Sequence, residues 1–276
     1  MTNAVNEAIQ THYGRGELAE HILAALQQAG VDIRQLSVAT LAPIDEFHIR
    51  GREATLELAR AAGLHAACHI LDIGSGIGGT SRCLAQEFGC RVTGIDLTEE
   101  YCQVAAMLTA KVGLEERIDY RQGDATNLPF EDNQFDVVWT EHVAMNIPDK
   151  QRFYSEMYRV LKPGGTLAIY DVLAGSSGPV LFPVPWARTP ETSFLVSAEA
   201  LQDLLRAAGF TISSWKDSTA EAREWFTKLA EKIRRDGFPP LGFHLLMGPD
   251  FREMAQNQGR NLEEGRITLA QIVAVK

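Results

Sequence analysis

The stretch LDIGSGIGGT, residues 71–80, passes from apolar residues into a loop that is rich in glycine. Gly74, Gly76 and Gly79 satisfy the spacing GxGxxG, and Gly78 also makes the run GxGxG. Bare backbone lets a ligand approach closely, and a helix that starts in such a loop offers free N–H groups. The stretch therefore predicts a strand, a ligand-binding loop and a helix in that order.

The segments around this loop alternate between strand-like and helix-like patterns. Apolar runs predict strands at 69–73, 91–97, 118–124, 135–140, 165–173, 210–218 and 266–276. Helical spacing predicts helices at 17–29, 52–64, 80–88, 99–114, 153–161 and 197–208. Strands that alternate with helices imply an α/β fold with a mostly parallel, doubly wound sheet.

Composition restricts the kind of partner. The 276 residues are 45% hydrophobic and 22% charged, as in a globular protein with one domain and an elaboration. A formal net charge of −10 without a basic patch argues against nucleic acid and anionic membranes as partners. Four cysteines without metal-ligand spacing predict buried thiols and no metal site, and the absence of a long apolar run predicts a cytoplasmic protein.

Three acidic residues stand at the expected strand ends. Asp72 precedes the first glycine, where a carboxylate would repel a pyrophosphate and favour a cationic ligand. Asp96 can accept hydrogen bonds from ribose hydroxyls, or can cap the next helix. Asp124 can accept an adenine amino proton while the Ala125 N–H pairs with the ring, or can belong to an ordinary turn. Together these acids favour a nucleoside that carries positive charge.

The segments LDIGSGIGG, GIDL, GDATNLPF, FDVVWTEHV and RVLKPGG resemble, in order, the motifs of class I S-adenosylmethionine-dependent methyltransferases. GREATLELARAAGL and LFPVPWA are most similar to small-molecule types, including sarcosine/dimethylglycine and phosphoethanolamine N-methyltransferases. The resemblance implies a Rossmann-like sheet of seven strands whose last strand is antiparallel. We expect an N-terminal helical lid at 1–66 and a cofactor-binding domain at 67–276, with a substrate loop at 174–196 and a helical insertion at 220–262.

The same resemblance implies roles at the cofactor site. The backbone at Gly74 and the side chain of Glu141 would hold the methionine end, and Asp72 would support it. Gly76 and Gly78 belong to the same glycine loop, and Leu97 follows the ribose-binding acid in the chain. Tyr13 could fold over the ligand as part of the lid, although it could equally begin a surface helix.

Residues after the fourth strand are candidates for contact with the methyl acceptor. His142 would contact the nucleophile and assist loss of its proton, because an ammonium group has no lone pair. Met145 and Asn146 would line the pocket, although Met145 could also be plain core.

The long loop after the fifth predicted strand offers a substrate pair. The Trp186 indole could attract a methylated amine, and the Arg188 guanidinium could clamp a carboxylate or phosphate. Together they would recognise a zwitterion, although Trp186 could instead pack the loop and Arg188 could face water. His244 could cap the pocket, although packing alone would also explain it.

The sequence therefore predicts an enzyme that transfers a methyl group from S-adenosylmethionine to a small molecule, most simply an amine nitrogen. A thiol, carboxylate or hydroxyl acceptor is also compatible with the pocket residues. An NAD-dependent oxidoreductase is disfavoured by Asp72, and a non-catalytic S-adenosylmethionine-binding protein would show no turnover.

Overall fold

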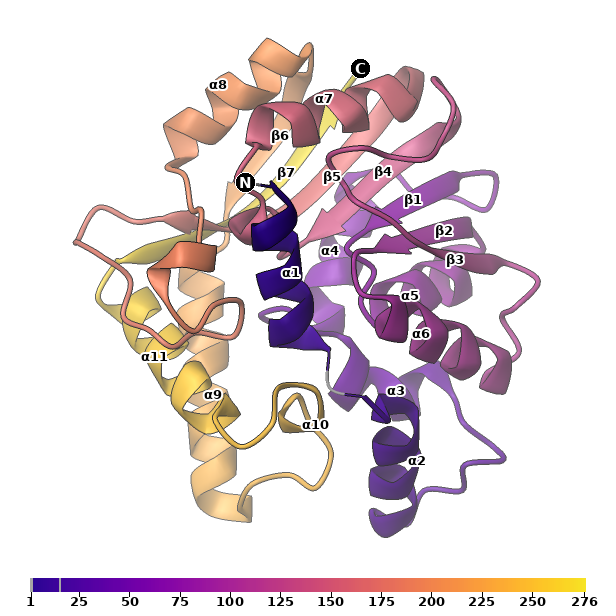
Figure 1. The fold of residues 1–276 in the computed structure, drawn as a ribbon, viewed down its shortest axis with the longest axis vertical. Helices are drawn as coiled ribbons and strands as arrows, with labels where there is room; N and C mark the ends of the chain where they lie inside the picture. The colour runs from indigo at the N-terminus through magenta and orange to yellow at the C-terminus, as the bar shows by residue number, and fades with distance from the viewer. Residues whose placement is uncertain (1, 15) are drawn as a thin grey trace.

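The computed structural model describes residues 2–14 and 16–276, and within this part of the chain seven strands form one sheet (Figure 1). The strands are β1 (His69–Ile73), β2 (Arg91–Asp96), β3 (Ile118–Gln122), β4 (Phe135–Glu141), β5 (Leu161–Ala174), β6 (Thr211–Asp217) and β7 (Ile267–Val275). Their order is β3-β2-β1-β4-β5-β7-β6, and β7 runs antiparallel to both of its neighbours. This confirms the predicted seven-stranded sheet with an antiparallel last strand.

Helices cover both faces of the sheet. They are α1 (Thr2–Tyr13), α2 (Leu18–Gln28), α3 (Val38–Asp45), α4 (Arg52–Ala61), α5 (Gly79–Phe88), α6 (Glu99–Lys111), α7 (Lys150–Val160), α8 (Ala198–Ala208), α9 (Thr219–Asp236), α10 (His244–Met247) and α11 (Phe251–Glu263). Ile70 of β1 packs in the core with α4 and α5, whereas its neighbour Leu71 packs in the core with α7 and α8. Successive strand residues point to opposite faces, so this apolar strand is buried on both sides.

The strand order reverses at β1, which lies between β2 and β4. In an open α/β sheet, this reversal leaves a crevice at the carboxyl ends of the strands, and ligands bind there. The glycine loop follows β1 directly, so it lies at this crevice.

Within the predicted helical lid at 1–66, two helices, α1 and α3, were not predicted individually. In α3 the Ser37 hydroxyl accepts a hydrogen bond from the Thr40 N–H at 3.2 Å, which caps the helix. Pro43 lies inside α3 and obscured the helical signal. The end of α3 brings residues 45 and 46 to the crevice.

Three helices, α9 to α11, lie between β6 and β7, where the sequence predicted a helical segment interrupted at 237–248. The short helix α10 occupies part of that interruption. In Figure 1 these helices lie below the sheet, with α10 next to the N-terminal helices.

All four cysteines are buried and free, as predicted. Among the described residues, no cluster of three or more His, Cys, Asp or Glu side chains could hold a metal ion. Likewise, no helix in residues 2–14 and 16–276 has the length and apolar character that a membrane span requires.

We expect Gly79→Ala to lower the free energy of unfolding by about 1 to 3 kcal/mol, because an added Cβ would overlap the Asp45 carbonyl oxygen at the end of α3. Gly259→Ala in α11 is the matched control, since its Cβ would meet Phe226 at an ordinary 3.5 Å. That change should raise stability by about 0.5 to 1 kcal/mol, because alanine favours the helix. Urea unfolding of both variants measures the two effects, and equal effects would disprove the predicted overlap.

Candidate active site

A cavity of about 490 Å³ opens at the carboxyl ends of the parallel strands. Its wall includes the glycine loop, the ends of β2 and β4, the segment between α3 and α4, helix α1 and the helices inserted before β7. Gly74 and Gly76 line this cavity. So do twelve other residues that were predicted to contact the cofactor or the methyl acceptor: Tyr13, Asp72, Asp96, Leu97, Asp124, Ala125, Glu141, His142, Met145, Asn146, Trp186 and His244. Gly78 and Arg188 do not line it.

The glycine loop is held by backbone hydrogen bonds to β2. The N–H groups of Gly74 and Ser75 both donate to the Ile95 carbonyl, at 2.8 and 3.1 Å. Gly74 and Gly76 have φ of +72° and +53°, a region that favours glycine, and both line the cavity. An added Cβ at Gly76 would meet nothing within 4 Å, so bare backbone faces open space there.

Gly78 does not line the cavity, and its lack of a side chain allows close packing. Its φ is +85°, and an added Cβ would collide with the Tyr120 hydroxyl and the Arg82 guanidinium. It directly precedes α5 and so aims the start of this helix. The third position of the GxGxG run is therefore explained by close packing of the loop against β3 and α5.

Asp72 is buried on the face of β1 that packs against α5. Its Oδ2 accepts a hydrogen bond from the Ser81 hydroxyl at 2.5 Å. Burial raises the pKa of Asp72 to about 7, although the bond from Ser81 acts in the opposite direction. Neighbouring carboxylates of Glu141 and Asp96 raise this pKa further. A cation in the cavity would favour the ionised form of this group.

The end of β2 places Asp96 beneath the glycine loop. Its Oδ2 accepts from the Gly76 N–H and its Oδ1 from the Thr98 N–H, both at 2.9 Å. Burial raises the pKa of Asp96, and these backbone donors lower it. A carboxylate has about four acceptor positions, so both oxygens can still accept ligand hydroxyls.

Helix α1 lines the cavity with Asn6, Ile9 and Tyr13. The Asn6 amide donates to Asp124 Oδ2 at 2.8 Å, and the Gln10 amide donates to the Leu97 carbonyl at 2.9 Å. The Tyr13 hydroxyl donates to Asn146 Oδ1 at 3.2 Å. Tyr13 therefore belongs to the wall of the cavity. It directly contacts Asn146, which was predicted to line the pocket of the methyl acceptor.

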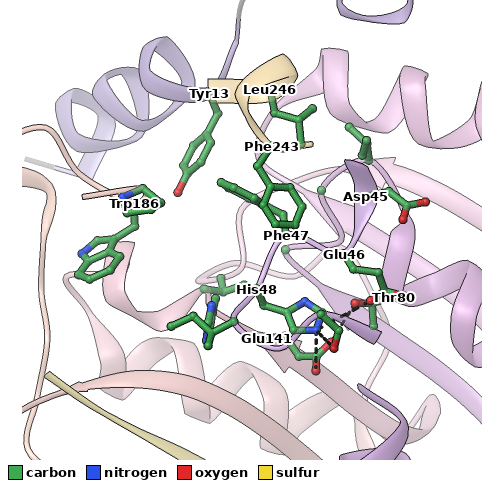
Figure 2. A pocket seen from close by; sticks show the side chains of 18 of the residues that line it. Tyr13, Asp45, Glu46, Phe47, His48, Thr80, Glu141, Trp186, Phe243 and Leu246 are labelled. Atoms are coloured by element: carbon green, nitrogen blue, oxygen red, sulfur yellow. Dashed lines mark hydrogen bonds and ion pairs between the residues drawn. The ribbon is translucent and has the colours of Figure 1, made fainter. Parts of the chain in front are cut away.

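Glu141 ends β4 on the face that α4 and α5 cover. Its Oε2 accepts a hydrogen bond from the Thr80 hydroxyl at 2.9 Å (Figure 2). It also accepts one from the Thr55 hydroxyl at 3.1 Å. Burial raises its pKa to about 7, and its hydrogen bonds act in the opposite direction. Through these two hydroxyls, Glu141 contacts both α5 and α4.

Glu46 and His48 were missed by the sequence analysis. They come from DEFHIRG, residues 45–51, between α3 and α4, and they lie beside Glu141 in Figure 2. Burial raises the pKa of Glu46 to about 7 and lowers that of His48. The only indication of a site here was that Asp45, Glu46 and His48 lie close together just before a predicted helix. Nothing in the sequence showed that this segment lies next to β4.

His142 follows β4 in a left-handed conformation with φ of +53°. Its ring lies 4.9 Å from the Tyr170 ring, and its Nε2 is buried without a partner among the described residues. Burial lowers the pKa of His142 well below its usual value. Most non-glycine residues avoid this conformation, but histidine is among those that adopt it more often.

Asn146 anchors the loop that follows β5. Its amide nitrogen donates to the carbonyls of Trp186 and Thr192, at 2.8 and 2.9 Å. The Trp186 side chain is 1% exposed, and its indole N–H donates to Ser193 Oγ at 2.9 Å. Trp186 therefore combines core packing with a position in the cavity wall, and Met145 is likewise buried in the core and the wall.

Arg188 lies away from the cavity. It is half exposed and forms an ion pair with Asp250 at 2.6 Å. The structure thus does not bring Trp186 and Arg188 together as a zwitterion clamp. His244 does line the cavity, where its neighbour Phe243 packs edge to face on Phe47 with ring centroids 5.0 Å apart.

Much of the cavity near the inserted helices is apolar, although Lys232 of α9 and Gln258 of α11 also line it. Its wall carries aromatic and aliphatic side chains from the segment before α4, the loop after β5 and the inserted helices: Phe47, Ile49, Trp186, Trp225, Phe226, Leu229, Ile233, Phe238, Leu241, Phe243, Leu246 and Phe251. In Figure 2 Phe47, Phe243 and Leu246 face the cavity opposite Trp186.

Known proteins share both the central sequence and the fold. Residues 71–169 match the family described as "Methyltransferase domain". Glycine/sarcosine/dimethylglycine N-methyltransferase of Actinopolyspora halophila is 34% identical over 50% of this chain and 26% of its own length. Sterol 24-C-methyltransferase of Saccharomyces cerevisiae is 37% identical over 41% of this chain and 30% of its own length. The chain therefore spans about a quarter to a third of these relatives.

Solved structures extend the likeness to nearly the whole chain. A phosphoethanolamine N-methyltransferase of Haemonchus contortus, in complex with S-adenosylhomocysteine, has a TM-score of 0.72 at 24% identity and covers 89% of this chain and 61% of its own. The [4+2]-cyclase SpnF has a TM-score of 0.71 at 24% identity and covers 99% of this chain and 96% of its own. Residues 71–169 are therefore similar to a methyltransferase domain, and the chain has the fold of S-adenosylmethionine-dependent methyltransferases.

Proposed function

We propose that the protein transfers a methyl group from S-adenosylmethionine to a small molecule with a large apolar body. This proposal rests mainly on the lining of one cavity. Carboxylates and bare backbone line it at the sheet, and aromatic side chains line it toward the inserted helices. The cofactor, when bound, supplies an activated methyl group on a positively charged sulfur.

The residues present fit this cofactor. Asp72 and Glu141 are buried carboxylates whose pKa values burial raises to about 7, so a cation beside them would relieve an unfavourable charge. Asp96 and Asp124 can accept from hydroxyl and amino groups at the other end of the ligand. Gly76 leaves room for close approach.

The wall formed by the inserted helices carries many aromatic side chains and a cation, Lys232. The aromatic side chains of the inserted helices would bury an apolar molecule, at about 25 cal/mol for each Å² removed from water. Arg188, the expected clamp for a carboxylate, is engaged with Asp250 on the surface. We therefore propose an apolar acceptor that presents an amine, hydroxyl or thiol to the polar end, in place of an amino acid.

Binding and turnover are tested separately. Calorimetry should detect S-adenosylhomocysteine binding and no NAD⁺ binding. Labelled S-adenosylmethionine is then offered with matched acceptors: glycine against 1-naphthylmethylamine, ethanol against 2-naphthol, and 2-mercaptoethanol against thiophenol. Transfer to a naphthyl or phenyl member is expected. Efficient transfer to glycine would refute the apolar acceptor, and absence of nucleoside binding would refute the whole proposal.

Asp96→Asn should weaken S-adenosylhomocysteine binding about 5- to 150-fold, since hydrogen bonds to a charged group contribute about 1.5 to 3 kcal/mol. Asp203→Asn on the exposed surface of α8 is the control and should bind normally. Calorimetry on both variants measures the effect. An unchanged Kd for the Asp96 variant would remove this carboxylate from the binding site.

A further inference from the structure

The two ring nitrogens of His48 differ in their hydrogen bonding: one has partners, and the other has none among the described residues. Its Nε2 lies 3.0 Å from the Gly51 carbonyl oxygen and 3.0 Å from Thr55 Oγ1. A carbonyl oxygen only accepts, so Nε2 carries the hydrogen and the neutral ring has its lone pair on Nδ1. Nδ1 makes no hydrogen bond with any described residue and is not among the fully buried unpartnered atoms. It therefore borders the cavity that His48 lines.

Two carboxyl groups near His48 offset part of the cost that burial places on a positive charge on its ring. Nε2 lies 3.8 Å from Glu46 Oε2 and 3.7 Å from Glu141 Oε1. Thr55, which accepts from Nε2, can donate its own hydrogen to Glu141 Oε2 at 3.1 Å. A base that is oriented by hydrogen bonds and flanked by carboxylates has the arrangement found in many acid–base sites.

His142 lacks this arrangement. Its Nε2 is buried and has no partner in the described chain, so no hydrogen bond fixes which nitrogen carries the proton. The nearest rings are Tyr170 at 4.9 Å and His48 at 6.0 Å, and a protonated His48 would disfavour a second charge there. Of the two histidines, His48 is the better placed proton acceptor.

We propose that Nδ1 of His48 removes the proton from the acceptor's nucleophilic nitrogen, oxygen or sulfur. This inference rests on the proposed methyl transfer. As the acceptor atom forms its bond to the methyl carbon, the electron pair of its bond to hydrogen returns to that atom, and the proton passes to Nδ1. The C–S electron pair stays with the sulfur. The resulting imidazolium lies between Glu46 and Glu141, and water takes up its proton after product release.

The protonation state can be measured without an acceptor. Protein labelled with ¹⁵N in histidine and saturated with S-adenosylhomocysteine is studied by long-range ¹H–¹⁵N correlation at pH 7.5, and His48→Gln assigns the signals. We expect Nε2 of His48 to be protonated and Nδ1 to be unprotonated. A proton on Nδ1 at this pH would overturn the proposal.

Turnover tests the chemical role with the fastest acceptor from the matched panel. His48→Gln retains a donor for the Gly51 carbonyl but has no base, so kcat should fall about 100-fold or more while the Kd for S-adenosylhomocysteine changes less than threefold. His142→Gln is the comparison variant, and its kcat should fall much less. Added imidazole should restore part of the His48→Gln rate, and the acid limb of the wild-type pH profile should disappear.

The outcomes separate the two proposals. A His48→Gln enzyme with unchanged kcat, or a larger loss in His142→Gln, would overturn the role of His48 and leave methyl transfer intact. Failure of S-adenosylhomocysteine to bind the wild type would refute the proposed function itself. If His48→Gln fails to fold, His48→Asn and the tautomer of the wild type decide the question.

Discussion

Arg82→Met is expected to lower the free energy of unfolding by about 3 to 5 kcal/mol, the scale of breaking a buried ion pair. The guanidinium is fully buried and donates to Asp45 Oδ2 at 2.7 Å and to the Ile77 carbonyl at 2.8 Å. It also donates to Thr109 Oγ1 at 3.1 Å and to the Ala105 carbonyl at 3.3 Å. Arg82 thus joins α3, the glycine loop, α5 and α6, and its removal leaves a buried carboxyl group without its cation.

Urea unfolding compares Arg82→Met with the double variant Asp45→Leu/Arg82→Met. The double variant should recover part of the loss, since no unpaired charge remains. A loss below about 1 kcal/mol in the single variant would show that the pair contributes little. An equal loss in both variants would assign the effect to packing and to the other hydrogen bonds of Arg82.

Glu141→Gln is expected to stabilise the ligand-free protein by about 3 kcal/mol at pH 8 and to weaken S-adenosylhomocysteine binding. Burial raises the pKa of this carboxyl from 4.5 to about 7. Between these values the unfolded chain has released its proton and the folded chain has kept it, so the wild type loses stability as pH rises. The glutamine variant avoids this cost, which is fully present above pH 7 and absent below about pH 4.5.

Unfolding at pH 5 and at pH 8 tests this expectation, with Glu263→Gln on α11 as a control outside the cavity wall. The stability gain should be large at pH 8 and small at pH 5. A gain that does not depend on pH would show that the titration of Glu141 does not cause it. Unchanged nucleoside affinity would separate Glu141 from the cofactor.

Local sequence was sufficient to predict the candidate residues that lie at the end of a strand or just after it. The glycine loop, Asp96 and Asp124 each follow a predicted strand, and parallel strands bring their carboxyl ends to one edge of the sheet. The pairing of Gly74 with the Ile95 carbonyl follows from the same geometry. The fold and the convergence of these residues on one cavity were therefore accessible from the order of motifs.

The other walls of the cavity depended on contacts between distant segments. Trp186 and Arg188 are two residues apart, yet one is buried in the cavity wall and the other is paired with Asp250 on the surface, because the loop turns between them. His48 and Glu141 are far apart in the chain, and the packing of α4 and the segment before it against the end of β4 brings them together.

The sequence by itself determined the sheet, the glycine loop and the line of acidic residues, because strand periodicity and turn chemistry act over a few neighbouring residues. Tertiary structure alone decided which histidine has an oriented ring and which side chains form the apolar wall. Those properties arise from burial and from hydrogen bonds across the chain, and neither has a local pattern.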